Sequence, residues 1–164
     1  MAYTLDTVSK KVLQQRKLGK RVGLIKGCFD ILHVGHVELF RFAQKHIDML
    51  IIGLDSDETI ALTKGMNRPI NRFQYRVTVM SELRSVDLVF GIKEMVNFNN
   101  PVDAENVYLS IAKKINPSCL ITSKHADRYW KIKEERAKHL KMKFVPYTGK
   151  FDQSTTQIIN KLNS

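Results

Sequence analysis

Short apolar runs alternate along the chain with longer segments in which apolar residues recur every three or four positions. Buried strands are predicted for five short runs rich in Val, Ile and Leu, at 22–25, 48–54, 86–90, 119–122 and 144–145. Helical spacing predicts helices over 5–18, from 37 onwards, over 71–85 and 102–115, in a basic segment that carries Trp130, and after residue 156. Strands and helices therefore follow one another in regular alternation.

This alternation is typical of a parallel sheet whose strands are joined by right-handed helical crossovers. The predicted fold class is α/β, a Rossmann-like three-layer sandwich with a five-stranded, mostly parallel sheet, in a single domain over residues 1–164. In open sheets of this kind, ligands bind at the carboxyl ends of the strands. The turn after the first strand and Asp55 after the second are expected there.

One apolar face of each predicted helix defines the expected core. Gly19 is expected to end the first helix, and Asn71 to cap the helix over 71–85. The last helix is expected to return towards the sheet. The expected apolar faces consist of Val8, Val12, Leu13 and Leu18; Val37, Phe40 and Ile47; Phe73, Val77, Met80 and Leu83; and Ile158, Ile159 and Leu162.

Composition describes an ordinary globular protein, with 43% hydrophobic and 26% charged residues. No apolar run approaches the ~20 residues that span a bilayer, so no membrane partner is expected. The first residues, MAYTLDTVSKK, lack the apolar region of a secretory signal. Cys28 and Cys119 give no disulfide framework, so a cytoplasmic location is expected.

The net charge of +11 is the main compositional anomaly, because such a field attracts nucleotides, nucleic acids and acidic surfaces. Basic residues cluster over 10–21 and 124–143, and no zinc-finger spacing or RNA-binding aromatic pattern accompanies them. We interpret them as solvated helix faces that raise the local concentration of phosphate substrates. Nucleic-acid binding is the less favoured alternative.

The segment 22–46 carries the strongest chemical signal, a strand, a Gly-containing turn, two histidines and a helix. His33 and His36 are three residues apart, so at a helix start both imidazoles point to the same side, and Gly35 leaves room for an approaching group. A helix N-terminus binds phosphate, and imidazoles there can stabilise charge that develops in a transition state. A packing role for both histidines is the alternative.

A metal role for the histidine pair would need a third protein ligand, because zinc rarely binds with two. His46, His125 and His139 could supply one only if the fold brought them close. No metal-ligating residues are therefore predicted.

The motif GCFDILHVGH resembles the HxGH motif of the cytidylyltransferase-like nucleotidyltransferase superfamily. The hydroxyls at 154–156 resemble its second motif, although alone they would read as an ordinary N-cap. The similarity covers nearly the whole chain. The segments KGMNRPINRFQYRVTVMSELRSVD and STTQIINKL resemble the adenylyltransferase domain of bacterial ADP-heptose synthases.

The resemblance implies attack by a phosphorylated acceptor on the α-phosphate of a nucleoside triphosphate, with Mg²⁺ as cofactor and a homodimeric assembly. The residues implied as catalytic are His33, His36 and Arg76. Those implied in nucleotide binding are Gly27, Cys28, Phe29, Gly35, Ser154, Thr155 and Thr156. Those implied in substrate or phosphate binding are Asp30, Lys45 and Lys64, with Asp30 more suited to capping the turn than to acting as a base.

Three departures from the family pattern bear on the substrates. Similar cytidylyltransferases carry Arg where this chain has Gly149, which favours ATP over CTP. The heptose enzymes usually carry Asn where this chain has Lys26, and a different segment in place of 122–127. Heptose 1-phosphate is the leading acceptor, and a separate kinase partner that makes this sugar phosphate is a further, less favoured hypothesis. The alternatives are a cytidylyltransferase that uses glycerol 3-phosphate and a non-catalytic nucleotide or nucleic-acid binder.

Overall fold

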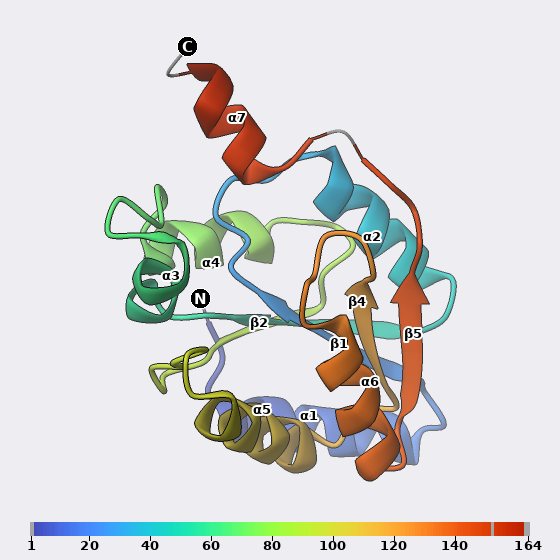
Figure 1. The fold of residues 1–164 in the computed structure, drawn as a ribbon. Helices are drawn as coiled ribbons and strands as arrows, with labels where there is room; N and C mark the ends of the chain where they lie inside the picture. Colours follow the sequence, from blue (N-terminus) through green and yellow to red (C-terminus); the bar gives the residue numbers. More distant parts are fainter. Residues whose placement is uncertain (1, 152, 163–164) are drawn as a thin grey trace.

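The computed structural model describes residues 2–151 and 153–162, which form one five-stranded sheet covered by helices on both faces (Figure 1). The strand order is β3-β2-β1-β4-β5, and every pairing is parallel. The strands are β1 (Val22–Gly27), β2 (Met49–Leu54), β3 (Leu88–Gly91), β4 (Cys119–Ser123) and β5 (Lys143–Tyr147). The five predicted strands and the Rossmann-like fold class are confirmed, with a sheet that is wholly rather than mostly parallel.

Helices α1, α5 and α6 pack on one face of the sheet, and α2 and α4 on the other, which gives the predicted three layers (Figure 1). The helices are α1 (Leu5–Lys17), α2 (Val34–Gln44), α3 (Asp57–Lys64), α4 (Phe73–Ser81), α5 (Pro101–Ile115), α6 (Trp130–His139) and α7 (Thr155–Leu162). Two apolar clusters, one on each face, bury the sheet. Among the helices described, none is long and apolar enough to cross a membrane.

The predicted apolar faces are partly wrong at the helix ends. Val8 and Val12 of α1 are fully buried, but Leu13 and Leu18 are 56% and 71% exposed. Helix α2 begins at Val34 rather than Val37, because His33 takes the N-cap position. Val37 is consequently on the outer side of α2 and is 38% exposed.

Helix α4 begins two residues later than predicted, because a tertiary contact replaces the expected cap. Asn71 does not cap it; its side-chain amide donates to the carbonyl oxygen of Asp30. The first free N–H, that of Phe73, instead donates to the carboxylate of Asp57 in α3. The helix then ends at Ser81 rather than at Ser85.

Helix α7 does not return towards the sheet, contrary to the prediction. It projects from the end of the molecule at which β4 and β5 terminate (Figure 1). Its start is held because the Thr155 hydroxyl donates to the carbonyl oxygen of Ile31, 3.1 Å away. Leu162 at its other end is 78% exposed. The helix therefore borders the carboxyl ends of the strands.

Candidate active site

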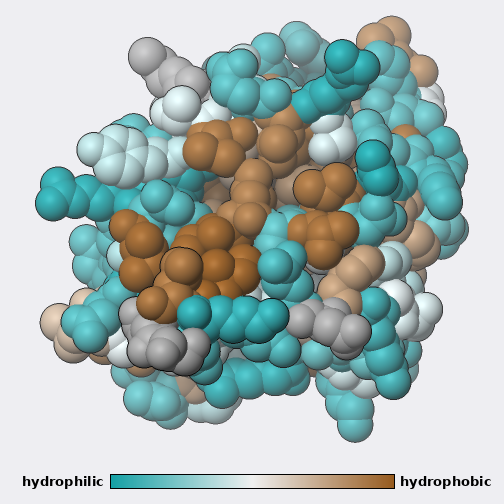
Figure 2. Space-filling model, turned by 90° about the horizontal axis from the view of Figure 1, so that it is seen from above, coloured by the Kyte–Doolittle hydropathy of each residue, from teal (hydrophilic) through white to brown (hydrophobic). Residues whose placement is uncertain are grey.

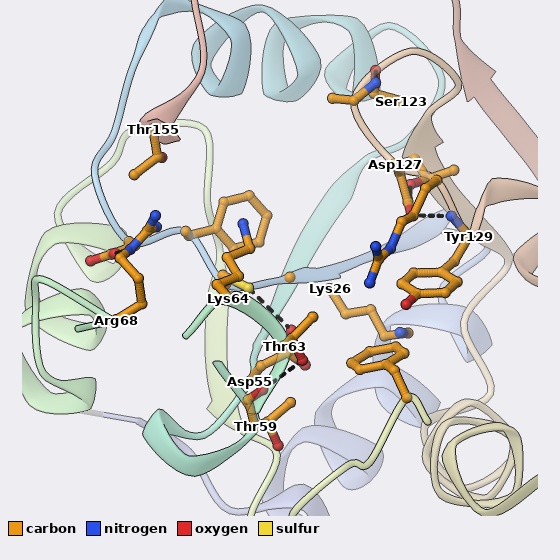
Figure 3. A pocket seen from close by; sticks show the side chains of 18 of the residues that line it. Lys26, Asp55, Thr59, Thr63, Lys64, Arg68, Ser123, Asp127, Tyr129 and Thr155 are labelled. Carbon is orange, nitrogen blue, oxygen red and sulfur yellow. Dashed lines mark hydrogen bonds and ion pairs between the residues drawn. The ribbon is translucent and has the colours of Figure 1, made fainter. Parts of the chain in front are cut away.

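A cleft of about 990 Å³ opens at the carboxyl ends of β1, β2 and β4. Figure 2 looks onto this end of the molecule and shows apolar side chains around its centre with polar groups at the rim. The start of α7 and the loop after α3 border one half of the cleft, and α5 and α6 border the other. Figure 3 shows Lys64, Arg68 and Thr155 on the first side and Asp127 and Tyr129 on the second.

The turn after β1 is shaped by Phe29 rather than by Gly27. Phe29 has a φ of 45°, which places it in the left-handed region, whereas Gly27 is the last residue of β1. The Phe29 ring packs against Phe40 and meets the edge of the His36 ring, with centroids 5.1 Å apart. A Cβ at Gly27 would lie 3.3 Å from the Phe29 ring. Gly27 is thus needed for close approach.

The two motif histidines lie together at the start of α2, as predicted. Their ring centroids are 3.9 Å apart. The His33 Nδ1 accepts the backbone N–H of Gly35, which leaves the proton on Nε2, where it can be donated to a ligand. A Cβ at Gly35 would lie 3.0 Å from the His33 ring, so glycine permits this ring position. His36 lines the cleft.

Both imidazoles are neutral at neutral pH. Burial lowers the pKa of His36 to about 3, with smaller effects from His33 and Lys64. Burial, and then Lys64, also lowers the pKa of His33. The His36 Nδ1 is buried and has no hydrogen-bond partner among the described residues. The pair is therefore suited to donate N–H groups to an anion.

Asp30 organises the loop that borders the cleft. Its buried carboxylate accepts hydrogen bonds from the Arg68 Nε at 2.8 Å and from the backbone N–H groups of Ile70 and Asn71. All of these donors come from the protein, so Asp30 fixes the loop rather than binding a phosphate. The capping role expected for Asp30 fits this geometry, and Arg68 is held by an ion pair.

Arg76 is placed differently from the expectation that it approaches the phosphates. Its side chain is inaccessible to solvent, and it is not among the cleft-lining residues. The guanidinium donates to the carbonyl oxygens of Asn71, Cys28 and Asp55, and pairs with the Asp57 carboxylate at 2.7 Å. Burial against these acceptors makes Arg76 a positioning residue that joins the ends of β1 and β2 to α4.

The three hydroxyls at the start of α7 divide between capping and cleft lining. Ser154 accepts the N–H of Gln157 at 3.3 Å, as an ordinary N-cap does. Thr155 and Thr156 line the cleft, with Thr156 exposed. Lys64, at the end of α3, is exposed and lines the same half. The start of α7, the start of α2 and Lys64 thus border the same half of the cleft.

Lys45 and Trp130 lie outside the cleft lining. Lys45 follows the last turn of α2, at the opposite end of that helix from His33, so its expected phosphate contact does not fit. Trp130 packs under the Lys124 ammonium, 4.2 Å from the ring centroid. Cys28 does line the cleft, with its Sγ 3.8 Å from the Asp55 carboxylate. Burial raises the pKa of Cys28 to about 11, so its thiol stays protonated.

The sequence indicated the second half of the cleft only through Lys26 and the segment 122–127, which depart from the family pattern, and did not identify Lys133 and Arg136. Four cations lie there, Lys26 from β1, Arg128 from the loop before α6, and Lys133 and Arg136 from α6. Lys133 pairs with Asp127, and Arg136 pairs with Glu105 of α5. Lys133 and Arg136 are three residues apart in a strongly basic segment, which predicts a solvated helix face. Both side chains are nevertheless buried.

The described residues include no cluster of three or more His, Cys, Asp or Glu side chains that could hold a metal ion. The cleft carboxylates Asp30, Asp55 and Asp127 all accept hydrogen bonds from protein groups. This donor set does not form a dedicated metal cage. It does fit Mg²⁺ that arrives on a nucleotide, because Mg²⁺ is commonly bound through substrate phosphates.

The parallel α/β sheet, with two helix N-termini and a pair of neutral histidines beside one cleft, is a Rossmann-like fold of the nucleotidyltransferase class. The chain belongs to the cytidylyltransferase-like family, whose family model matches residues 24–161.

Relatives in sequence carry the name bifunctional protein HldE. The one from Aliarcobacter butzleri is 32% identical over 160 residues, which cover 97% of this chain and 30% of that protein. The one from Caulobacter vibrioides is 35% identical over 149 residues, 91% of this chain and 29% of that protein. This chain therefore spans less than a third of the length of these relatives.

Solved structures share the fold at low sequence identity. The lipopolysaccharide core biosynthesis protein from Thermoplasma volcanium superposes with a TM-score of 0.60 at 18% identity, covering 81% of this chain and all of that one. Pantoate-beta-alanine ligase from Francisella tularensis gives a TM-score of 0.62 at 15% identity, covering 99% of this chain and 78% of that one. At this identity the likeness concerns the fold alone.

Proposed function

We propose that this chain transfers AMP from ATP to a phosphorylated acceptor, a sugar 1-phosphate such as heptose 1-phosphate, and releases pyrophosphate. The observation that carries the proposal is the arrangement of His36, Thr155 and Thr156 around one half of a single cleft, with His33 beside His36. The N-termini of α2 and α7 there offer partial positive charge to a triphosphate. HldE relatives over nearly the whole chain support the same class of reaction.

In the proposed reaction, an oxygen of the acceptor phosphate attacks the α-phosphorus of the nucleotide. A new P–O bond forms there, the bond to the bridging oxygen breaks, and pyrophosphate leaves with its electron pair. The attacking phosphate is already anionic, so no general base is needed. Imidazole N–H groups of His33 and His36 would stabilise the developing charge, and Lys64 would neutralise the leaving phosphates. Mg²⁺ bound to the phosphates would offset their charge.

The surroundings of Gly149 support ATP over CTP. A Cβ at Gly149 would lie 2.0 Å from the Tyr147 hydroxyl, so no side chain fits unless the Tyr147 ring moves. That ring is held between Phe42 and Phe151, with centroids 5.1 and 5.8 Å away. An arginine at this position, as in similar cytidylyltransferases, would therefore require the Tyr147 ring to move.

The first test is pyrophosphate release with Mg²⁺, using ATP or CTP with a panel of phosphorylated acceptors. The panel holds heptose 1-phosphate, glycerol 3-phosphate, phosphocholine, phosphoethanolamine, FMN and phosphopantetheine. Release with ATP and a sugar 1-phosphate is expected. Release with CTP and an alcohol phosphate would reassign the substrates, and tight nucleotide binding without release would indicate a binding protein. Sedimentation tests the predicted homodimer separately.

His36→Ala is expected to lower turnover by about 100-fold or more, because it removes an N–H donor from the developing charge. The matched control is His46→Ala, since His46 packs on Phe42 after the other end of α2. Unchanged circular dichroism would show that both variants fold. Turnover of His36→Ala near that of the control would refute the assignment.

A further inference from the structure

The half of the cleft between α5 and α6 contains a lysine whose charge no carboxylate of the described residues contacts. Lys26 is the next-to-last residue of β1 and is half-buried. Its ammonium lies over the Tyr108 ring, 2.9 Å from the centroid. In Figure 3 the side chain extends towards the side of the pocket on which Tyr129 and Asp127 lie.

The carboxylates near Lys26 are all engaged elsewhere. Asp127 pairs with Lys133 and accepts the N–H of Tyr129 at 2.9 Å. Glu105 pairs with Arg136. Asp55 accepts the Tyr108 hydroxyl at 3.1 Å. Lys133 and Arg136 are thus paired, and Arg128 is exposed and lies over the Tyr129 ring. Lys26 is the half-buried cation of this half of the cleft that no carboxylate of the described residues contacts.

An unpaired cation in a partly desolvated cleft favours a ligand that neutralises it, because a charge out of water is costly without a partner. Burial, and next the nearby Lys133, lowers the pKa of Lys26 well below its usual value, while Asp55 acts in the opposite direction. An anionic ligand group beside Lys26 would oppose this lowering of its pKa. A sugar hydroxyl carries no charge and would leave the Lys26 ammonium without an anionic partner.

We propose that the acceptor carries a second anionic group, a carboxylate or a second phosphate, and that Lys26 binds this group in the α5–α6 half of the cleft. The proposal rests on the proposed function for the role of the ligand as acceptor. It narrows the sugar 1-phosphate of the proposed function to one whose sugar carries an anionic group besides the phosphate, in place of heptose 1-phosphate. Lys26 is then the residue that determines acceptor specificity. The Tyr108 ring lies against its ammonium, and Lys133 adds a second positive charge nearby.

The test is calorimetric binding of matched probes, with and without α,β-methylene-ATP and Mg²⁺. Glucose 1-phosphate and heptose 1-phosphate carry no anionic group besides their phosphate and are called the neutral probes. Glucuronic acid 1-phosphate and glucose 1,6-bisphosphate carry a second anionic group and are called the acidic probes. At least one acidic probe is expected to bind about 10-fold or more tightly than the neutral ones. The better acidic probe identifies the second group as carboxylate or phosphate.

Lys26→Met, which keeps the length of the side chain without its charge, is expected to weaken the acidic probe by about 10- to 100-fold and the neutral probes by less than about threefold. Lys26→Arg should retain most of the preference, and Lys113→Met on the exposed face of α5 is the control. The proposal would be overturned if acidic and neutral probes bound equally, or if neither acidic probe bound. It would also be overturned if Lys26→Met lost equal affinity for both kinds of probe. Acid-selective binding without pyrophosphate release would refute the proposed function and leave this inference standing.

Discussion

At the scale of the residue, the candidate site contains two neutral imidazoles. A histidine at a phosphate site is often assumed to be charged, but burial keeps His36 and His33 uncharged. The acceptor of the Gly35 N–H is the His33 Nδ1, so the backbone itself selects the tautomer. Neutral rings bring N–H donors to the cleft without repelling one another.

The low pKa of His36 predicts a loss of stability in acid. The unfolded chain binds a proton near pH 6.5, whereas folded His36 does so only near pH 3. Protons therefore favour the unfolded state as the pH falls through this window, by about 2 kcal/mol at pH 5. Urea unfolding at pH 7 and pH 5 measures the difference.

His36→Gln should remove most of this acid sensitivity, because glutamine does not titrate. The remaining dependence would include His33, whose pKa is also lowered. An equal pH dependence in the wild type and in His36→Gln would contradict the assigned burial of the ring.

At the scale of the element, α4 is attached to the sheet through one side chain. Arg76 reaches from α4 to the carbonyl oxygens that follow β1 and β2 and to the carboxylate of Asp57 in α3. Arginine can satisfy several acceptors at once because its donors have a fixed planar geometry. The wall of the cleft is thereby held in place by a residue that lies outside it.

Arg76→Met is expected to lower the free energy of unfolding by about 3–5 kcal/mol, because buried acceptors and a carboxylate lose their partner. Urea denaturation measures this loss. Arg72→Met is the control, since Arg72 is exposed just before the same helix. A stable Arg76→Met protein with lowered turnover alone would assign Arg76 to the phosphates after all.

At the scale of the whole molecule, the cleft joins parts of the chain that are distant in sequence. The N-terminus of α2 follows residue 33, and that of α7 follows residue 154. The Thr155 hydroxyl and the Ile31 carbonyl link the two. A bound triphosphate would connect both helix starts at once.

ATP with Mg²⁺ is expected to slow amide hydrogen exchange in α2 and α7 together, by about tenfold or more in the first turn of each, because bound phosphates occupy the free N–H groups. Peptides of α1 provide the internal control, since that helix lies on the far side of the sheet from α2. Protection confined to one of the two helices would show that a single phosphate site operates.

The sequence alone was sufficient for the strand–helix order, because buried parallel strands are continuous apolar runs and their crossover helices are amphipathic. Local spacing also placed His33 and His36 together at a helix start, since three residues nearly complete one helical turn. The hydroxyls at 154–156 were placed at a helix start for the same reason. These features depend on neighbours along the chain.

Only the tertiary structure decided which polar side chains face the cleft and which form hydrogen bonds and ion pairs with other protein groups. Arg76 and Asp30 look like phosphate ligands in the sequence, but acceptors and donors from distant segments occupy them. Lys26 stands out in the sequence only as a departure from the family pattern. In the structure, Lys133 and Arg136 each pair with a carboxylate, whereas no carboxylate of the described residues contacts Lys26. Hydrogen bonding and charge neutralisation act through space, so residues distant in sequence determine them.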